Sequence, residues 1–74
     1  MFKIMDLSKL EEMGFKKDGF DYVYRETVDG VMKTLFTVYA GSSYLRYSKT
    51  SYSSLGQLRC IYEWTKKNYI LWEE

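Results

Sequence analysis

The Asp29-Gly30 dipeptide limits the fold of this chain more than any other feature, because it separates two runs of alternating apolar and polar residues, Phe20–Val28 and Val31–Ala40. Aspartate and glycine both tolerate the positive φ that the two central positions of a type I′ turn require. A turn of this kind also fixes the register of the hairpin, and it places Glu26 opposite Lys33 as a cross-strand pair of opposite charge. The sequence therefore predicts an antiparallel β-hairpin at the centre of the fold.

A short helix is predicted before the hairpin, over about Leu7–Met13. Asp6 or Ser8 can cap its N-terminus, and Ser8 and Glu11 have the spacing of a capping box. Gly14 follows directly and is suited to the left-handed conformation that ends many helices. We therefore expect the first helix to end before the hairpin begins.

A third strand is predicted after the hairpin, over about Tyr44–Thr50. The short loop that precedes it favours an antiparallel register with Tyr39 opposite Tyr44 and Phe36 opposite Tyr47. The hairpin and this strand together form a three-stranded antiparallel sheet.

A long helix is predicted to start near Ser54, which forms a second capping box with Gln57. Its core-facing stripe consists of Leu55, Leu58, Ile61, Tyr62, Thr65, Tyr69 and Trp72. Asn68 is an alternative end of the helix, and Tyr69–Trp72 would then form a short edge strand. The predicted fold is α+β, in the order α-β-β-β-α, with both helices on one face of the sheet.

The hairpin register divides the strand residues between two faces of the sheet. We assign the more aliphatic face to the helices: Val23, Met32, Phe36, Val38, Ala40, Leu45 and Tyr47. The opposite face then carries aromatic rings and charges: Phe20, Tyr22, Tyr24, Leu35, Tyr39, Tyr44, Glu26, Lys33, Arg46 and Ser48. The alternative is the reverse assignment, with the tyrosines beneath the helices, since a shift of one residue moves every side chain to the other face.

The aromatic content predicts a contact surface. Eight tyrosines, two tryptophans and four phenylalanines make up 19% of the 74 residues, which is more than a small core can bury. Exposed tyrosine, tryptophan and arginine dominate the energetics of many protein interfaces. The predicted partner-binding residues are Tyr22, Tyr24, Tyr39, Tyr44, Lys33 and Arg46.

A second contact surface is predicted on the outer side of the long helix, opposite its core-facing stripe. It consists of Cys60, Trp64 and Leu71. A second copy of the chain or another protein would cover Trp64, which is costly to leave in water. The alternative is that the first helix or the end of the chain packs over this tryptophan.

The residue content argues against catalysis. Histidine is absent and Cys60 is the only cysteine, so a nucleophile would lack its usual base and a zinc site would lack its usual ligands. The acidic residues follow no metal-ligand spacing. We therefore expect one domain over residues 1–74 that is not an enzyme and that uses no metal or cofactor.

The hydropathy pattern predicts a cytoplasmic protein without membrane contact. The longest unbroken apolar run is Tyr69–Trp72, which is too short to span a bilayer, and the first residues carry no export signal. A single cysteine fits a reducing compartment.

Two other binding functions share some of these ingredients. Tyrosines beside Lys33 and Arg46 also form the kind of surface on which single-stranded nucleic acid stacks, although a net charge of +1 is low for that role. A sponge for a small nucleotide signal would instead need a deep pocket, for example at a dimer seam.

The opening residues LSKLEEMGFKK at positions 7–17, the aromatic hairpin and the closing helix rich in lysine and aromatic residues resemble the small accessory proteins of bacteriophages and prophages of low-GC Gram-positive bacteria. This resemblance implies a host-takeover or anti-defence protein, of the anti-CRISPR kind, that inhibits or recruits by binding. The implied partner is a larger host protein or protein–nucleic-acid complex, such as a nuclease, in the host cytoplasm.

Overall fold

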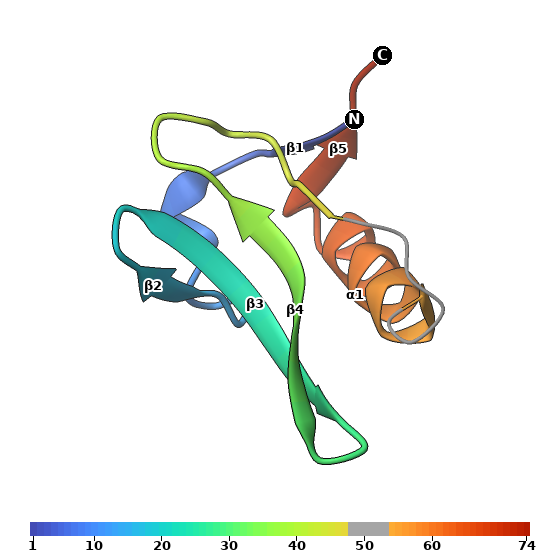
Figure 1. Ribbon diagram of the computed structural model, residues 1–74. Coiled ribbons are helices and arrows are strands. Elements are labelled where there is room, and N and C mark those ends of the chain that lie inside the picture. Colours follow the sequence, from blue (N-terminus) through green and yellow to red (C-terminus); the bar gives the residue numbers. More distant parts are fainter. Residues whose placement is uncertain (48–53) are drawn as a thin grey trace.

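The computed structural model describes residues 1–47 and 54–74, without the side chains of residues 54 and 55, and has an α+β fold (Figure 1). The elements in chain order are β1 (Phe2–Ile4), the 3₁₀ turn η1 (Leu7–Lys9), β2 (Lys16–Asp18), β3 (Asp21–Val28), β4 (Val31–Val38), α1 (Ser54–Lys66) and β5 (Ile70–Trp72). They form a three-stranded antiparallel sheet in the order β2-β3-β4 and a two-stranded sheet of β1 and β5. Among the described residues, no helix has the length and apolar character needed to cross a membrane.

The predicted hairpin is confirmed as β3 and β4. Its turn contains Asp29 and Gly30 with φ of 52° and 77°, and Glu26 lies opposite Lys33 as expected. The outer half of the hairpin extends beyond the rest of the molecule (Figure 1). The local turn chemistry is therefore sufficient to determine this half of the register.

A β-bulge between Tyr24 and Arg25 changes the register in the inner half of the hairpin. Tyr24 pairs with Phe36, whereas the register set by the turn, continued without a bulge, would place Leu35 opposite it. The main-chain carbonyl of Leu35 then accepts a hydrogen bond of 3.1 Å from the buried Gln57 side chain of α1. The extra residue thus gives the helix a polar attachment point on the sheet.

The bulge also reverses part of the predicted assignment of faces. Tyr24, which we expected on the solvent face, packs against Phe15, Phe36 and Trp64 with ring centroids 5.8, 6.0 and 5.4 Å away. Phe36 has 1% of its surface exposed and lies on the same side of the hairpin as Tyr24. The alternative, with tyrosine beneath the helix, is therefore correct for Tyr24.

The helix predicted over Leu7–Met13 is wrong, because the segment forms only the 3₁₀ turn η1 followed by further turns. The cap is Asp6, whose Oδ1 accepts hydrogen bonds from the Ser8 N–H at 3.0 Å and the Ser8 hydroxyl at 2.7 Å. The Ser8 hydroxyl is therefore engaged by Asp6 and not by a capping box. The turns do end at Gly14, with φ of 101°, as predicted.

The third strand of the sheet is β2 and not the predicted segment over Tyr44–Thr50, part of which lies outside the described residues. The predicted register is nevertheless correct where it is described, since Thr37 pairs with Arg46 in an isolated bridge. Lys3 of β1 pairs with Tyr44 in a second bridge. Residues 43–46 therefore connect β4 with β1 and join the two sheets.

The predicted edge strand near the end of the chain is confirmed as β5, which pairs with β1 in the register Phe2–Trp72 and Ile4–Ile70. Asn68, with φ of 61°, ends the preceding helix, and the N–H of Tyr69 donates to the carbonyl of Trp64 at 2.8 Å. The strand β1 was not predicted.

The buried face of α1 differs from the predicted stripe. Leu58 and Tyr62 were expected in the core, but 62% and 64% of their surfaces are exposed. Gln57, Cys60 and Trp64 are buried instead. The centroid of the Trp64 ring lies 4.9 Å from that of Phe36 and 5.5 Å from that of Phe15. A large indole therefore fills the space between α1 and the sheet.

Candidate binding surface

The six residues of the predicted tyrosine surface do not share one face. Tyr24 packs in the core, and a hydrogen bond with Cys60, together with burial, raises its pKa. The Tyr44 hydroxyl donates to Glu73 at 2.6 Å. Lys33 lies on the outer half of the hairpin opposite Glu26. The remaining three, Tyr22, Tyr39 and Arg46, line two hollows in the surface.

The three residues of the predicted outer helix surface do not form an exposed surface together. Cys60 and Trp64 each have 5% of their surface exposed, because α1 turns them toward the sheet. Leu71 is exposed, at 56%, but it lies on β5. The prediction failed because two neighbouring stripes of α1 are similarly apolar, and pattern alone does not distinguish them.

An open hollow of about 330 Å³ contains two of the predicted tyrosines. We call it the Phe20 hollow. It is lined by Leu7, Ser8, Leu10, Phe20, Tyr22, Val38, Tyr39, Ala40, Gly41 and Ser42. Its base includes the buried Leu10 and Val38, and its rim carries Phe20, Tyr39 and Leu7 with 87%, 52% and 48% of their surfaces exposed. The base and part of the rim are therefore apolar, while Ser8 and Ser42 add polar groups to the lining.

The exposure of Phe20 results from the β2–β3 turn. Asp18 and Asp21 form the last pair of the ladder, so Gly19 and Phe20 are the two residues of the turn. Gly19 has φ of 62°, as the first position of a type II′ turn requires. The second position accepts polar residues, and a side chain there has no neighbouring strand to pack against. The local fold therefore gives no reason for a phenylalanine at position 20.

Hydrogen bonds hold the other walls of the hollow. The Asp21 carboxylate accepts from the N–H of Ala40 at 2.8 Å, which ties the loop after β4 to the start of β3. Within that loop, the N–H of Ser42 donates to the carbonyl of Tyr39 at 3.0 Å. The loop that carries Tyr39 is thus held beside the start of β3.

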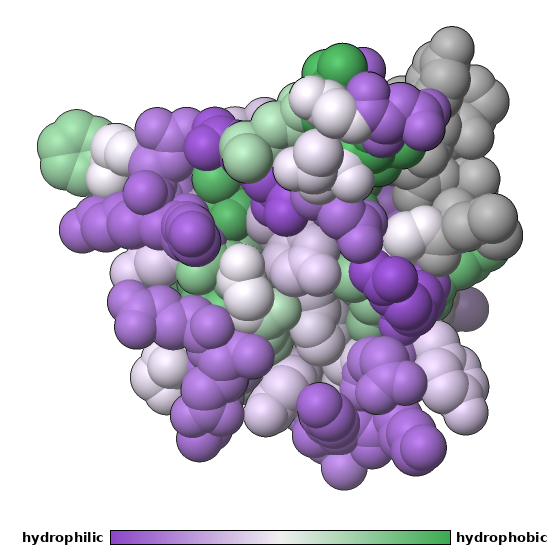
Figure 2. All heavy atoms as spheres, turned by 90° about the horizontal axis from the view of Figure 1, so that it is seen from below, coloured by the Kyte–Doolittle hydropathy of each residue, from purple (hydrophilic) through white to green (hydrophobic). Residues whose placement is uncertain are grey.

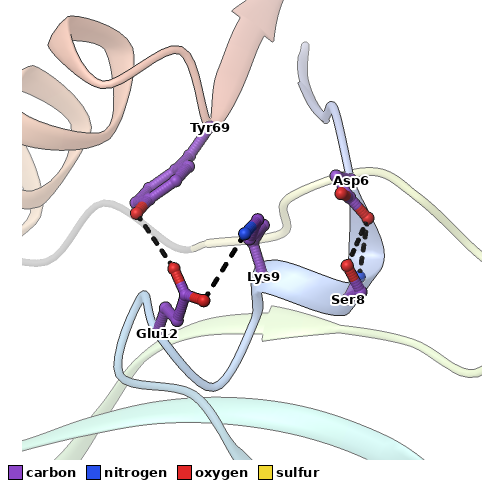
Figure 3. A network of polar contacts seen from close by, with 5 residues as sticks. All are labelled: Asp6, Ser8, Lys9, Glu12 and Tyr69. Atoms are coloured by element: carbon purple, nitrogen blue, oxygen red, sulfur yellow. Dashed lines mark hydrogen bonds and ion pairs between the residues drawn. The ribbon is translucent and has the colours of Figure 1, made fainter.

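A network of polar contacts fixes the η1 wall (Figure 3). Lys9 forms an ion pair of 3.5 Å with Glu12, and Glu12 accepts a hydrogen bond of 3.3 Å from the Tyr69 hydroxyl. The hydroxyl and the N–H of Ser8 hold the pKa of Asp6 below its usual value. η1 is therefore attached to the segment that precedes β5, and the hollow has walls from three separate parts of the chain.

A larger hollow of about 440 Å³ takes in Tyr39 and Arg46. Its apolar lining residues Leu35 and Phe36 are each only 1% exposed, and its other lining residues include Thr34, Thr37 and Tyr47. It shares the exposed Tyr39 with the Phe20 hollow but lacks the exposed Phe20 and Leu7. The face of the molecule seen from below is also largely hydrophilic, with hydrophobic residues between the polar ones (Figure 2).

In the described part of the chain, no group of three or more histidine, cysteine, aspartate or glutamate residues could hold a metal ion.

No family model, curated protein or solved structure matches the chain.

Proposed function

We propose that the protein is a non-enzymatic binding protein that docks on a larger protein through the Phe20 hollow. The observation that carries this proposal is the 87% exposure of a phenylalanine at a turn position that accepts polar residues. Burial of one phenylalanine side chain contributes roughly 1.5–3 kcal/mol. The fold gains almost none of this free energy from Phe20, whereas a complex that covers the ring would gain it.

The shape of the hollow supports a protein segment with a bulky apolar side chain as the occupant. A volume of about 330 Å³ lies at the lower limit of ligand-binding cavities, and the hollow is open. An aromatic or large aliphatic side chain inserted between Phe20 and Tyr39 would contact the base at Leu10 and Val38. Aromatic residues that pack against an inserted side chain are common among interface hot spots.

The resemblance to phage accessory proteins indicates which kind of partner the protein binds. It supports the proposal that the partner is a host nuclease or defence complex and that docking inhibits or redirects it. The single-stranded nucleic-acid alternative has less support, because Tyr24 packs in the core and the Tyr44 hydroxyl is held by Glu73. A stacking platform needs such rings free to contact bases.

The experiment compares capture of host proteins by wild type, Phe20→Ala and a control, Tyr62→Ala, which removes a similarly exposed ring from α1. A partner bound by wild type and by the control, and bound at least about tenfold more weakly by Phe20→Ala, supports the proposal. A partner that binds all three equally well contradicts it. Tight, salt-dependent binding of a single-stranded oligonucleotide in a parallel titration would favour the nucleic-acid alternative.

A further inference from the structure

The strand β5 has one row of main-chain groups that faces away from β1. Met1 and Glu73 exchange both of their main-chain hydrogen bonds, at 2.9 and 2.7 Å, and the N–H of Met5 donates to Tyr69 at 2.9 Å. In an antiparallel ladder, pairs of this kind alternate with pairs that point outward. The main-chain N–H and C=O groups of Leu71 therefore point toward β1, whereas those of Ile70 and Trp72 point away from it.

This edge lacks the protection that the other sheet has. The edge strand β2 consists of Lys16, Lys17 and Asp18, and charged residues of this kind oppose edge-to-edge pairing. On β5, by contrast, Leu71 and Trp72 have 56% and 55% of their surfaces exposed. An apolar edge with open main-chain groups is a template for another strand.

We propose that β5 pairs in antiparallel orientation with β5 of a second copy of this chain, about a twofold axis at Leu71. In this register Ile70 lies opposite Trp72 of the second copy, and the two residues exchange main-chain hydrogen bonds. Leu71 faces Leu71 of the second copy in a close, non-hydrogen-bonded pair. The same surface serves both copies, as a twofold interface requires.

The charges around β5 favour this self-pairing. Lys66 and Lys67 precede the strand, and Glu73 and Glu74 follow it. Antiparallel pairing brings the acidic end of one copy toward the basic end of the other, whereas parallel pairing would bring like charges together. The order basic, apolar, acidic is thus complementary to itself in the proposed orientation.

The interface is small, so the dimer is expected to be weak. A three-residue edge buries less surface than the approximately 1,200 Å² of stable complexes. We therefore expect weak association, as in other interfaces of low area. β5 and the β2–β3 turn lie on opposite sides of the molecule (Figure 1), so dimerisation leaves the Phe20 hollow open.

The test is sedimentation equilibrium of the full chain from roughly 10 μM to 1 mM. Wild type should show concentration-dependent dimerisation, and Leu71→Glu should stay monomeric over this range, because it places two carboxylates face to face. Leu58→Glu is the matched control, since Leu58 is similarly exposed but lies on α1, and it should dimerise as wild type does. Circular dichroism confirms that each variant is folded.

Mixing variants tests the register directly. Leu71→Glu and Leu71→Lys should each be monomeric alone and should form a heterodimer when mixed, because the axis places the two positions opposite each other. A monomeric wild type at 1 mM, a dimer of Leu71→Glu as tight as wild type, or no heterodimer in the mixture would each overturn the proposal. Phe20→Ala should leave dimerisation unchanged, so this test is independent of partner binding at the hollow.

Discussion

The ring of Tyr24 lies directly over Gly14. A Cβ atom at position 14 would come within 2.7 Å of Cε2 of Tyr24, and Gly14 itself has φ of 101°. The glycine that ends the turns after η1 therefore also makes room for the tyrosine that the β-bulge turns inward. Two features ten residues apart in the sequence depend on each other at this contact.

Replacing Gly14 with alanine should destabilise the fold by about 2 kcal/mol or more, since it adds both backbone strain and a clash with a packed ring. Gly19→Ala is the matched control, because Gly19 also has a positive φ, of 62°, but a Cβ atom at position 19 would meet nothing within 4 Å. Urea denaturation measures both. An equal loss of stability in the two variants would show that Tyr24 does not pack against Gly14.

Replacing Trp64 with alanine should cost about 3–5 kcal/mol of folding free energy, because the indole fills the space between α1 and the sheet. A domain of this size has a stability on the order of 5 kcal/mol, so the variant should be largely unfolded. Trp72→Ala should remain folded, since 55% of the surface of Trp72 is exposed. Circular dichroism during thermal unfolding distinguishes the two. A folded Trp64→Ala with an unchanged midpoint would contradict the described core.

The hydroxyl of Tyr44 should titrate above its usual range. Its hydrogen bond to Glu73, and then the negative charge of that carboxylate, raise the pKa of Tyr44. A raised pKa means that the neutral phenol is favoured in the folded state, so the stabilising contribution is present below pH 10 and is lost as the pH rises through the higher folded value. Spectroscopic titration of the tyrosines should show two late-titrating groups, Tyr44 and the core residue Tyr24, whose pKa is also raised.

Glu73→Gln tests the cause of that shift. The variant lacks the charge, so one of the two late-titrating tyrosines should return toward its ordinary pKa, and Tyr44→Phe should remove the same group. The pKa of Tyr24 should stay raised in both variants, because its hydrogen bond with Cys60 and its burial are unchanged. Two late-titrating groups that both persist in both variants would show that Tyr44 is not one of them.

Phe20 should contribute little to folding. Because the ring is almost fully exposed, Phe20→Asn should change the free energy of unfolding by no more than about 0.5 kcal/mol. Asparagine is also well suited to a turn. The measurement is urea denaturation, with Phe36→Ala as a buried comparison that should lose about 3–5 kcal/mol. A loss of similar size at Phe20 would mean that the residue is structural.

Local chemistry made much of the β-structure predictable. The Asp29-Gly30 turn determined the outer hairpin register, and the loop after β4 correctly placed Thr37 beside Arg46. These pairings depend on turns of a few residues, whose conformations follow from the residues themselves. Asn68 likewise indicated where α1 ends and β5 can begin.

The assignment of the faces could not be made in the same way. The bulge beside Tyr24 has no signature in the alternating pattern, yet it decides that the tyrosine points inward. On α1, Leu58 and Tyr62 are as apolar as Cys60 and Trp64, and only the tertiary fit of the indole selects the second pair. The candidate site could not be fully predicted for the same reason. The sequence placed Phe20 on the aromatic face, but its exposure at a turn depends on the strand β2. The charged residues at positions 16–18 do not suggest a strand.

The two indoles of this protein occupy opposite environments, and this makes the chain its own optical probe. Trp64 is enclosed by aromatic rings, so its fluorescence should be blue-shifted and should move to longer wavelength only when the domain unfolds. Trp72 contacts Phe2 on one side and is open to water on the other. A variant that retains Trp64 alone would report the integrity of the interior, and one that retains Trp72 alone would report what approaches the outer strand.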